Sequence, residues 1–257
     1  MPQQWGLDSV AYMDQSYGGT TLADYAINHW FAYPPPRDTI QWWGRYFTTT
    51  GGFNPYRGNG EAVALINAIK ANPATNHRSG WILPLSDDAT NTIINGNKTQ
   101  GTNAGNAVCQ NVSYWLRTAP NMHMPGSGAL RIYLDIESTV STQYWQGWHT
   151  AVSLYYYNQQ YPAPYYAAAY GHHYSSNCAT LASAYRAASF WSNTPEPNCY
   201  SPGPAWGPDK CPSDIPPTEA WQYGEHCMSG EVDVDLANTS YGGPYGNGLM
   251  DYLIYCA

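Results

Sequence analysis

Charged side chains are scarce in this sequence of 257 residues, of which only 11% are Asp, Glu, Lys or Arg. The 10 Lys and Arg residues are scattered along the chain, and the formal net charge is -8. Because binding to phosphate requires clustered basic residues, this balance argues against a nucleic-acid-binding function. It also argues against adsorption to an anionic membrane by charge alone. Surface polarity must therefore come from amide and hydroxyl side chains, as is typical of secreted proteins.

Several motifs that would assign a function are also missing. No run of 18 apolar residues appears, so we expect no membrane span. The chain does not start with a basic segment followed by an apolar one, and we expect that any signal peptide has been removed. No G-x-G-x-x-G follows the first predicted strand, and no G-x-S-x-G occurs, which argues against dinucleotide binding and a serine hydrolase. The seven His residues show no ligand spacing, so we expect neither a metal nor a cofactor.

Cysteine is present in an even number but never as C-x-x-C, which disfavours a zinc or redox motif. In a chain so poor in charge, an even count indicates an oxidising compartment and up to three disulfides, whose pairing stays open. Five of the six cysteines lie from Cys178 onward, which predicts stapled C-terminal loops and a secreted protein. The six are Cys109, Cys178, Cys199, Cys211, Cys227 and Cys256.

Short apolar runs alternate with segments of helical periodicity along the whole chain, which predicts βαβ units and a parallel sheet. The expected strands cover residues 5–12, 39–48, 80–86, 130–137, 163–170, 189–193, 219–224 and 232–238. The expected helices cover residues 21–31, 59–72, 103–118, 142–159 and 177–186. Eight strands predict an α/β fold of one (β/α)8-type barrel domain over residues 1–257, with irregular last repeats. An open doubly wound sheet is the structural alternative.

Aromatic residues are abundant, with 24 Tyr and 11 Trp raising their share to 15%. Flat aromatic faces stack on sugar rings, so this composition is compatible with glycan binding. Most of these side chains would serve equally well as half-buried packing residues.

Two carboxylates end the predicted strand at 130–137. The alternation places Tyr133, Asp135 and Glu137 on one face, and Leu134 and Ile136 on the other. Neighbouring carboxylates repel each other, which raises the proton affinity of at least one of them. Glycoside hydrolysis needs one protonated and one ionised carboxyl close together. A cap on the following helix is the structural alternative.

Other acidic residues occupy comparable places. Asp8 ends or nearly ends the apolar part of the first predicted strand, Trp5-Gly6-Leu7-Asp8, where a turn or cap is equally compatible with the pattern. Asp233 and Asp235 repeat the i, i+2 arrangement on the last strand and are expected to point into the barrel; calcium ligation is an alternative, although no D-x-D-x-D-G loop surrounds them. In Trp221-Gln222-Tyr223, two aromatics flank an amide, a combination suited to a sugar face and its hydroxyls.

The order of these motifs resembles the family-25 glycoside hydrolases, the lysozyme-type muramidases, and most of all their poorly characterised actinobacterial secreted branch. The resemblance spans nearly the whole chain but lacks a counterpart for the Pro-rich and Cys-rich insert at 193–217. It rests on Gly6-Leu7-Asp8, Trp43-Gly44-Arg45-Tyr46-Phe47, Tyr133-Leu134-Asp135-Ile136-Glu137, Trp221-Gln222-Tyr223 and Val234-Asp235-Leu236.

The resemblance implies that Glu137 is the general acid and that Asp135, Asp8 and Asp235 surround the cleft. The expected substrate-binding residues are Arg45, Tyr46, Tyr166, Trp191, Trp221, Gln222, Tyr223 and Asp233. We therefore expect a secreted, monomeric glycoside hydrolase that cleaves a polysaccharide or peptidoglycan-type glycan. A carbohydrate-binding barrel with weak or no turnover is the alternative, and a protein-interaction module with an inherited cleft is a third hypothesis.

Overall fold

The computed structural model describes residues 4–30, 40–49, 53–73, 77–159, 164–199, 206–238 and 248–257. Its strands are β1 (Gln4–Asp8), β2 (Ser16–Tyr17), β3 (Thr20–Thr21), β4 (Ile40–Thr48), β5 (Gly80–Ser86), β6 (Met122–His123), β7 (Leu130–Ile136), β8 (Tyr165–Gly171), β9 (Phe190–Ser192), β10 (Thr218–His226), β11 (Val232–Ala237) and β12 (Ile254–Cys256). Its helical segments are α1 (Leu22–Asp24), η1 (Tyr25–Trp30), α2 (Asn59–Ala71), α3 (Thr90–Asn95), α4 (Lys98–Thr118), α5 (Thr142–Gln159), α6 (Ser175–Leu181), η3 (Pro212–Asp214), α7 (Cys227–Gly230) and η4 (Gly248–Tyr252).

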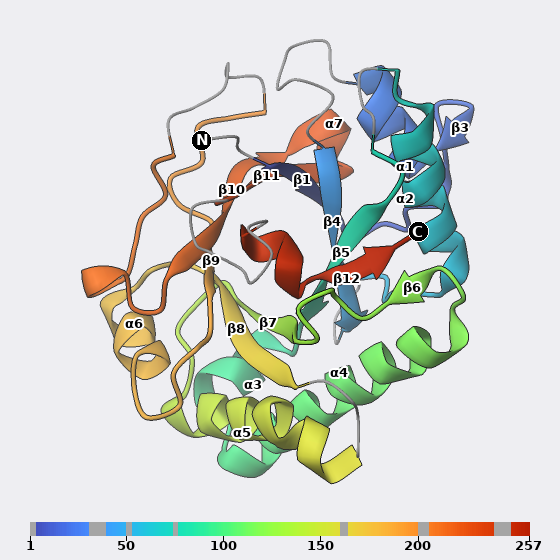
Figure 1. Ribbon diagram of the computed structural model, residues 1–257. Helices are drawn as coiled ribbons and strands as arrows, with labels where there is room; N and C mark the ends of the chain where they lie inside the picture. Colours follow the sequence, from blue (N-terminus) through green and yellow to red (C-terminus); the bar gives the residue numbers. More distant parts are fainter. Residues whose placement is uncertain are drawn as a thin grey trace.

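Eight of the strands close into a barrel, in the order β1, β4, β5, β7, β8, β9, β10 and β11 (Figure 1). Seven of them run parallel, as the alternation of strands and helices predicts. β11 is the exception, because it pairs antiparallel with both β1 and β10. The predicted barrel and its irregular last repeats are confirmed, whereas the prediction of a wholly parallel sheet is wrong at β11.

The C-terminal segment closes one end of this barrel. In Figure 1, η4 lies at the centre of the ring of strands, and β12 follows it onto β5 with antiparallel pairing. Leu249, Met250 and Leu253 pack inside the barrel beside Trp42 and Leu83. β12 pairs with the first residues of β5, so this plug lies at the N-terminal ends of the parallel strands. The opposite end is left for a ligand.

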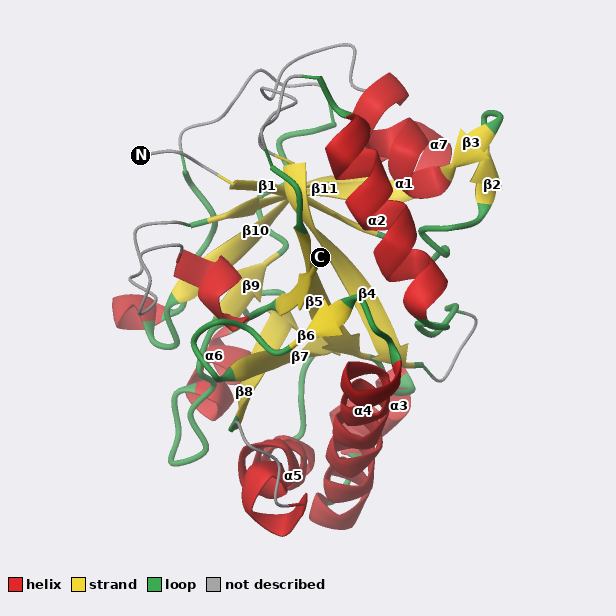
Figure 2. Ribbon diagram, turned by 45° about the vertical axis from the view of Figure 1, so that its right-hand side comes forward, coloured by secondary structure: helices red, strands yellow, loops and turns green. Residues whose placement is uncertain are grey.

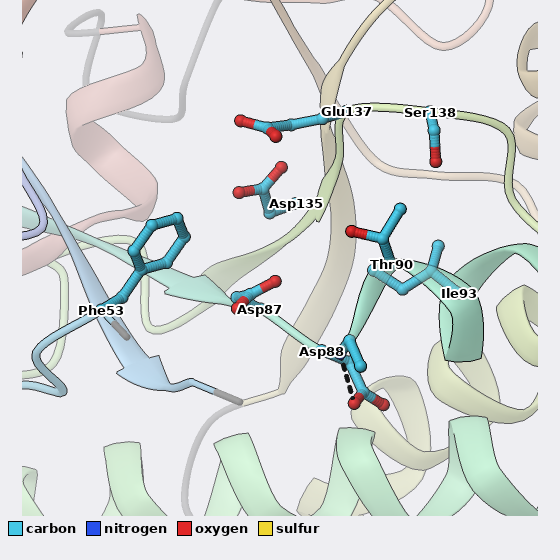
Figure 3. A pocket seen from close by; sticks show the side chains of 9 residues that line it. Phe53, Asp87, Asp88, Thr90, Ile93, Asp135, Glu137 and Ser138 are labelled. Atoms are coloured by element: carbon cyan, nitrogen blue, oxygen red, sulfur yellow. Dashed lines mark hydrogen bonds between the residues drawn. The ribbon is translucent and has the colours of Figure 1, made fainter. Parts of the chain in front are cut away.

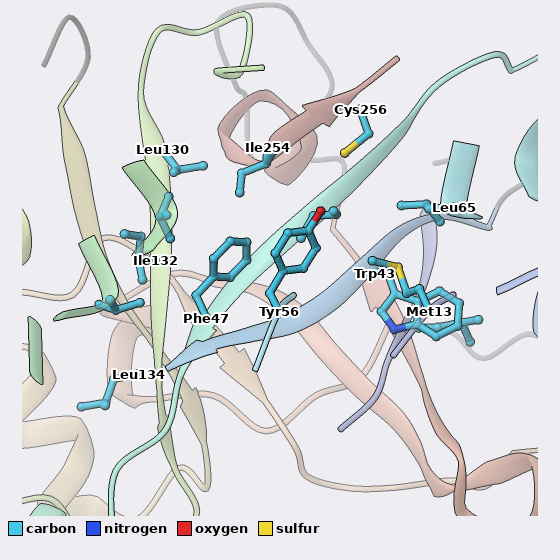
Figure 4. Close-up of a cluster of buried hydrophobic side chains, with 14 of the residues drawn as sticks. Met13, Trp43, Phe47, Tyr56, Leu65, Leu130, Ile132, Leu134, Ile254 and Cys256 are labelled. Carbon is cyan, nitrogen blue, oxygen red and sulfur yellow. The ribbon is translucent and has the colours of Figure 1, made fainter. Parts of the chain in front are cut away.

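A second, larger core lies between the barrel and its helices (Figure 4). Alternate residues of β7, such as Leu130, Ile132 and Leu134, point into it, together with Trp43 and Phe47 of β4. In Figure 2, α4 and α5 lie side by side below the barrel, and α1 and α2 cover another part of its wall. The period-2 alternation of these strands therefore separates an outer apolar face from a polar and aromatic inner face.

Local sequence sets the ends of α4 and its contact with α5. Asn97 and Gln100 form a reciprocal capping box, so the helix begins at Lys98, five residues before the predicted start at 103. A Cβ at Gly101 would lie 2.0 Å from the carbonyl oxygen of Tyr144. Glycine is therefore required where the two helices approach each other, and this contact fixes which face of α4 remains open.

Two disulfides connect the C-terminal loops, Cys178–Cys211 and Cys199–Cys227. Stapled C-terminal loops are thus confirmed, but the full set of three is not formed, because Cys109 and Cys256 are buried free thiols. No helix within the described ranges is long and apolar enough to span a membrane.

Candidate active site

Three aspartates from three different strands converge on the open end of the barrel. Asp8 ends β1, Asp135 is the next-to-last residue of β7, and Asp235 lies on β11. The pairing of β1 with β11 places Asp8 opposite Asp233 and Gly6 opposite Asp235. All three side chains are buried, with exposed fractions of 6%, 3% and 0% for Asp8, Asp135 and Asp235. The sequence-predicted carboxylates therefore form one cluster in the barrel.

An aromatic layer lies inside the barrel beneath these carboxyl groups. The ring of Trp191 lies 4.6 Å from that of Tyr170, 5.8 Å from that of Trp42 and 6.1 Å from that of Tyr133. A Cβ at Gly44 would lie 2.7 Å from the Cβ of Asp8 and 3.1 Å from the Trp191 ring. Glycine at this position thus lets β4 approach both side chains, and the aromatic layer excludes water from below the acids.

Burial dominates the electrostatics of the Asp8–Asp235 pair. It raises the pKa of Asp8 well above its usual value, and the charges of Asp235 and Asp233 raise this pKa further. The pKa of Asp235 is likewise raised well above its usual value by burial, with hydrogen bonding to Asp8 opposing the shift. Because two adjacent buried carboxylates cannot both ionise cheaply, the pair retains a proton at a pH where an exposed aspartate would have lost it.

Asp135 and Glu137 form a second carboxyl pair (Figure 3). In that view both carboxyl groups point toward the same space, and Asp87 lies below them. Burial and then the charge of Glu137 raise the pKa of Asp135 well above its usual value, and the hydroxyl of Tyr46 opposes this shift by donating a hydrogen bond of 2.8 Å to Oδ2. Glu137 follows the last residue of β7 and is exposed. One carboxyl is thus buried and hydrogen-bonded, and the other is exposed.

Two pockets meet at Glu137. One, of about 270 Å³, is lined by residues that include Asp87, Asp135 and Glu137. The other, of about 180 Å³, is lined by residues that include Asp8 and Glu137. Phe53 and Glu137 line both pockets, so Glu137 lies where the two halves of one cleft join. No Lys or Arg contributes to the lining that the structure describes.

Asp233 is held at the rim of the second pocket by a chain of hydrogen bonds. The hydroxyl of Tyr170 donates to Oε1 of Gln222 at 2.7 Å, and Nε2 of Gln222 donates to Oδ2 of Asp233 at 2.8 Å. The backbone N–H of His226 donates to Oδ1 of Asp233 at 2.6 Å. Burial nevertheless raises the pKa of Asp233 to about 6. Tyr46, Gln222 and Asp233, all predicted to bind substrate, thus lie at the cleft.

Arg45 is placed elsewhere, although the sequence predicts it as a substrate-binding residue. Its guanidinium is fully buried: Nε donates to Glu61 at 2.7 Å, Nη1 to the carbonyl of Ser9 at 2.9 Å, and Nη2 to the carbonyl of Asn54 at 3.0 Å. Arg45 therefore connects the segments that follow β1 and β4, and the structure does not place it at the cleft. Its contacts are those of a structural residue that fixes the loops beside the cleft.

The remaining aromatic predictions also lie away from the open cleft. Trp221 and Tyr223 alternate with Gln222 on β10, so their rings pack in the outer core against Trp5, and neither offers a free face. Tyr166 is exposed, but it is the second residue of β8, at the closed end of the barrel. Trp191 is fully buried in the layer beneath Asp235. These positions do not support direct stacking of these four rings on a sugar.

Phe53, Asp87 and Asp88 are among the cleft-lining residues that sequence reasoning missed. Asp87 directly follows β5, in the same position relative to its strand as Glu137 has after β7, and Asp88 comes next. Residues that directly follow a parallel barrel strand lie at the end of the barrel where the cleft is, so this position could have predicted the cleft residue. Phe53 follows a Gly-Gly pair in a loop, and no sequence pattern indicates its place. Within the described ranges, no group of three or more His, Cys, Asp or Glu residues is arranged to hold a metal ion.

The barrel fold is shared with solved structures. An uncharacterized protein of B. stearothermophilus is 18% identical with a TM-score of 0.63, and the match covers 97% of this chain and 99% of that one. A Tat-secreted protein of Mycobacterium tuberculosis, solved in complex with L-tartrate, is 14% identical with a TM-score of 0.52, over 96% and 98% of the two chains. A family GH25 lysozyme from Aspergillus fumigatus is 14% identical with a TM-score of 0.49, over 98% and 100%. No protein-family model and no curated protein matches the sequence.

These likenesses establish the fold. The chain is an eight-stranded α/β barrel with carboxylates at its open end, as expected from the resemblance to the family-25 glycoside hydrolases. What such a barrel does depends on its site and not on its architecture.

Proposed function

We propose that this protein is an exported glycoside hydrolase that cleaves a cell-wall or related polysaccharide. The observation that carries the proposal is an exposed carboxyl, Glu137, at the junction of two pockets, with a buried carboxyl, Asp135, beside it in the first pocket. The two disulfides support export, because such bonds persist in oxidising compartments.

Glu137 is the general acid in this proposal. The group that protonates the glycosidic oxygen must reach it, and Glu137 extends from the end of β7 into the space common to both pockets. Asp135 cannot move in this way, because it is buried and bound by Tyr46. As the bond between the anomeric carbon and the leaving oxygen breaks, ionised Asp135 stabilises the positive charge that develops on the sugar ring.

Proton sharing connects the two carboxyl groups. Since their charges repel, the pair binds a first proton more readily than an isolated carboxylate does. In the proposed mechanism the proton of the pair lies on Glu137 when a glycan occupies the cleft, and the hydrogen bond donated by the Tyr46 hydroxyl favours the charge on Asp135. The acid and the charged stabiliser that the reaction requires are then both in place.

The substitution Glu137→Gln tests the proposal on purified peptidoglycan and on chitin. If Glu137 is the acid, the rate of reducing-end release falls by about 10²–10⁴-fold. The matched control is Asp209→Asn, the same kind of change at an exposed carboxylate that lines neither pocket, which should keep the wild-type rate within about threefold. Unchanged hydrolysis by Glu137→Gln would remove this residue from the mechanism.

A carbohydrate-binding protein without turnover is the second candidate. One observation favours it: within the described residues, no hydrogen bond holds the Glu137 carboxyl in a fixed position, whereas efficient catalysis requires positioned groups. Binding of a glycan by the wild-type protein, without reducing-end release over long incubation, would favour this function over hydrolysis.

A further inference from the structure

A third pocket adjoins the cleft on the side of α4. Its volume is about 390 Å³, which is within the range of ligand pockets. Its lining residues are Thr48, Thr49, Asp87, Asp88, Thr92, Gln100, Asn103, Ala104 and Ala107. Asp87 and Asp88 also line the pocket of Asp135 and Glu137. The three pockets therefore form a continuous series across the open end of the barrel.

One face of α4 forms the floor of this third pocket. Gln100, Asn103, Ala104 and Ala107 are spaced i, i+3, i+4 and i+7, which places them on the same side of the helix. The face of α4 that carries Gly101 packs against α5 instead. Since neither alanine extends beyond Cβ, the two amides border an open, shallow surface.

Two amide side chains of the pocket, Asn103 and Gln100, have groups available to a ligand. Asn103 is exposed and has no hydrogen bond to any described residue. Gln100 accepts a hydrogen bond from the N–H of Asn97 through Oε1, which fixes the side chain and leaves its NH₂ group as a donor. Asp88 is oriented by Tyr144, whose hydroxyl donates to Oδ2 at 2.8 Å. These amide and carboxylate groups can bind sugar hydroxyls.

The lining also excludes other ligand classes. It contains no Lys or Arg and no aromatic ring, so neither an anionic polymer nor a stacked base or apolar ligand has a counterpart there. A neutral ligand rich in hydroxyl groups fits hydroxyl, amide and carboxylate side chains. The same class of ligand is required by the carboxyl pair in the adjoining pocket.

We propose that the α4 pocket is a distal subsite for the same glycan chain, which enters the series of pockets several sugar units away from the bond that is cleaved. This inference rests on the proposed function and extends it: the substrate is a long neutral polysaccharide cut internally, and short oligosaccharides do not occupy the α4 pocket.

The substitution Ala107→Trp tests the subsite by filling it with a large side chain. The probes are N-acetylglucosamine oligomers of two and six units, together with soluble glycol chitin as a long neutral polymer of the same sugar. For the long ligands we expect KM and Kd to rise at least tenfold with kcat within twofold, whereas the values for the dimer remain unchanged. Gln110→Trp is the matched control, because Gln110 is exposed on the same helix and lines none of the three pockets.

A milder substitution guards against misfolding of the tryptophan variant. Asn103→Ala removes an exposed amide and should raise KM for the long ligands by about two- to tenfold, the worth of one net hydrogen bond. An equal effect on short and long ligands, or no effect on either, refutes the subsite. If long glycans bind in an Ala107-dependent manner but are never cleaved, the subsite stands and the hydrolase proposal fails. If no glycan binds at all, both fail.

Discussion

The hydrogen bond from Tyr46 to Asp135 can be tested sharply, because one substitution removes only the hydroxyl oxygen that donates it. Tyr46 is buried, and its hydroxyl donates to Oδ2 of Asp135 at 2.8 Å. This bond lowers the pKa of Asp135, against the rise caused by burial and by Glu137. Substitution Tyr46→Phe keeps the ring that packs on Phe53 and deletes only the donor. The pKa of Asp135 should therefore rise further.

The magnitude follows from the difference between charged and neutral hydrogen bonds. A bond to an ionised carboxylate contributes about 1.5–3 kcal/mol, and a neutral one about 0.5–1.5 kcal/mol. The lost bond thus penalises the ionised form by about 1 kcal/mol more than the protonated form. Since one pKa unit corresponds to about 1.4 kcal/mol, the midpoint of Asp135 should move up by about one unit.

The sign of the effect on stability follows from the same pKa. The folded-state pKa of Asp135 is raised, so its contribution to stability is fully present below the unfolded pKa and is lost as the pH rises through the folded pKa. Tyr46→Phe enlarges that loss. The variant should be less stable than wild type by about 1 kcal/mol at pH 4, and by about 1 kcal/mol more at a pH where Asp135 ionises.

Two assays check this prediction. Carboxyl-carbon NMR titration reports the Asp135 midpoint in the absence of any substrate, and urea unfolding at several pH values reports the stability difference. In a pH–rate profile, the acidic limb should move upward by a similar amount. A midpoint that stays in place or falls in Tyr46→Phe would show that Tyr46 does not stabilise the charge on Asp135.

Two further predictions concern the rim and the wall of the cleft. The raised pKa of Asp233, about 6, means that this side chain destabilises the wild-type fold as the pH rises through that value. Relative to wild type, the free energy of unfolding of Asp233→Asn should therefore increase by about 2 kcal/mol between pH 4 and pH 8. A difference between the two proteins that stays constant over this pH range in urea unfolding would contradict the prediction. Arg45→Ala should lower the free energy of unfolding by about 3–5 kcal/mol, because it leaves Glu61 buried without its partner. Arg57→Ala, at an exposed ion pair with Asp14, should lower it by about 1 kcal/mol or less. Similar decreases in the two variants would refute the structural role of Arg45.

Much of the barrel follows from period-2 patterns in the sequence. Val232, Val234 and Leu236 alternate with Asp233 and Asp235, and the structure places the apolar residues outside and Asp235 inside, as predicted. The direction of β11 could not be predicted, because an alternating pattern is the same when it is read in either direction along the strand. Strand direction depends on the connection from β10, which is the short turn α7 and not a crossover helix.

A common physical cause explains why several predicted site residues lie away from the cleft. Neighbouring residues on a strand face opposite sides, so Arg45 and Tyr46 cannot both enter the cleft, and Trp221 and Tyr223 cannot share a face with Gln222. Motif order marks a strand as part of the site, but alternation decides which of its residues reach the ligand. The disulfide pairing and the place of Phe53 depend on loop conformations, which carry no periodic pattern.

The aromatic residues have their main effect on the carboxyl groups above them. Trp42, Trp191, Tyr133 and Tyr170 fill the barrel below the acids, and this filling removes the water that would otherwise stabilise ionised carboxylates. Burial is accordingly the largest cause of the raised pKa at Asp8, Asp135 and Asp235. The same packing therefore weakens the fold as the pH rises and retains protons at the site. Replacing these rings by polar side chains should lower the proton affinity of the acids, and the lost packing should destabilise the fold at every pH.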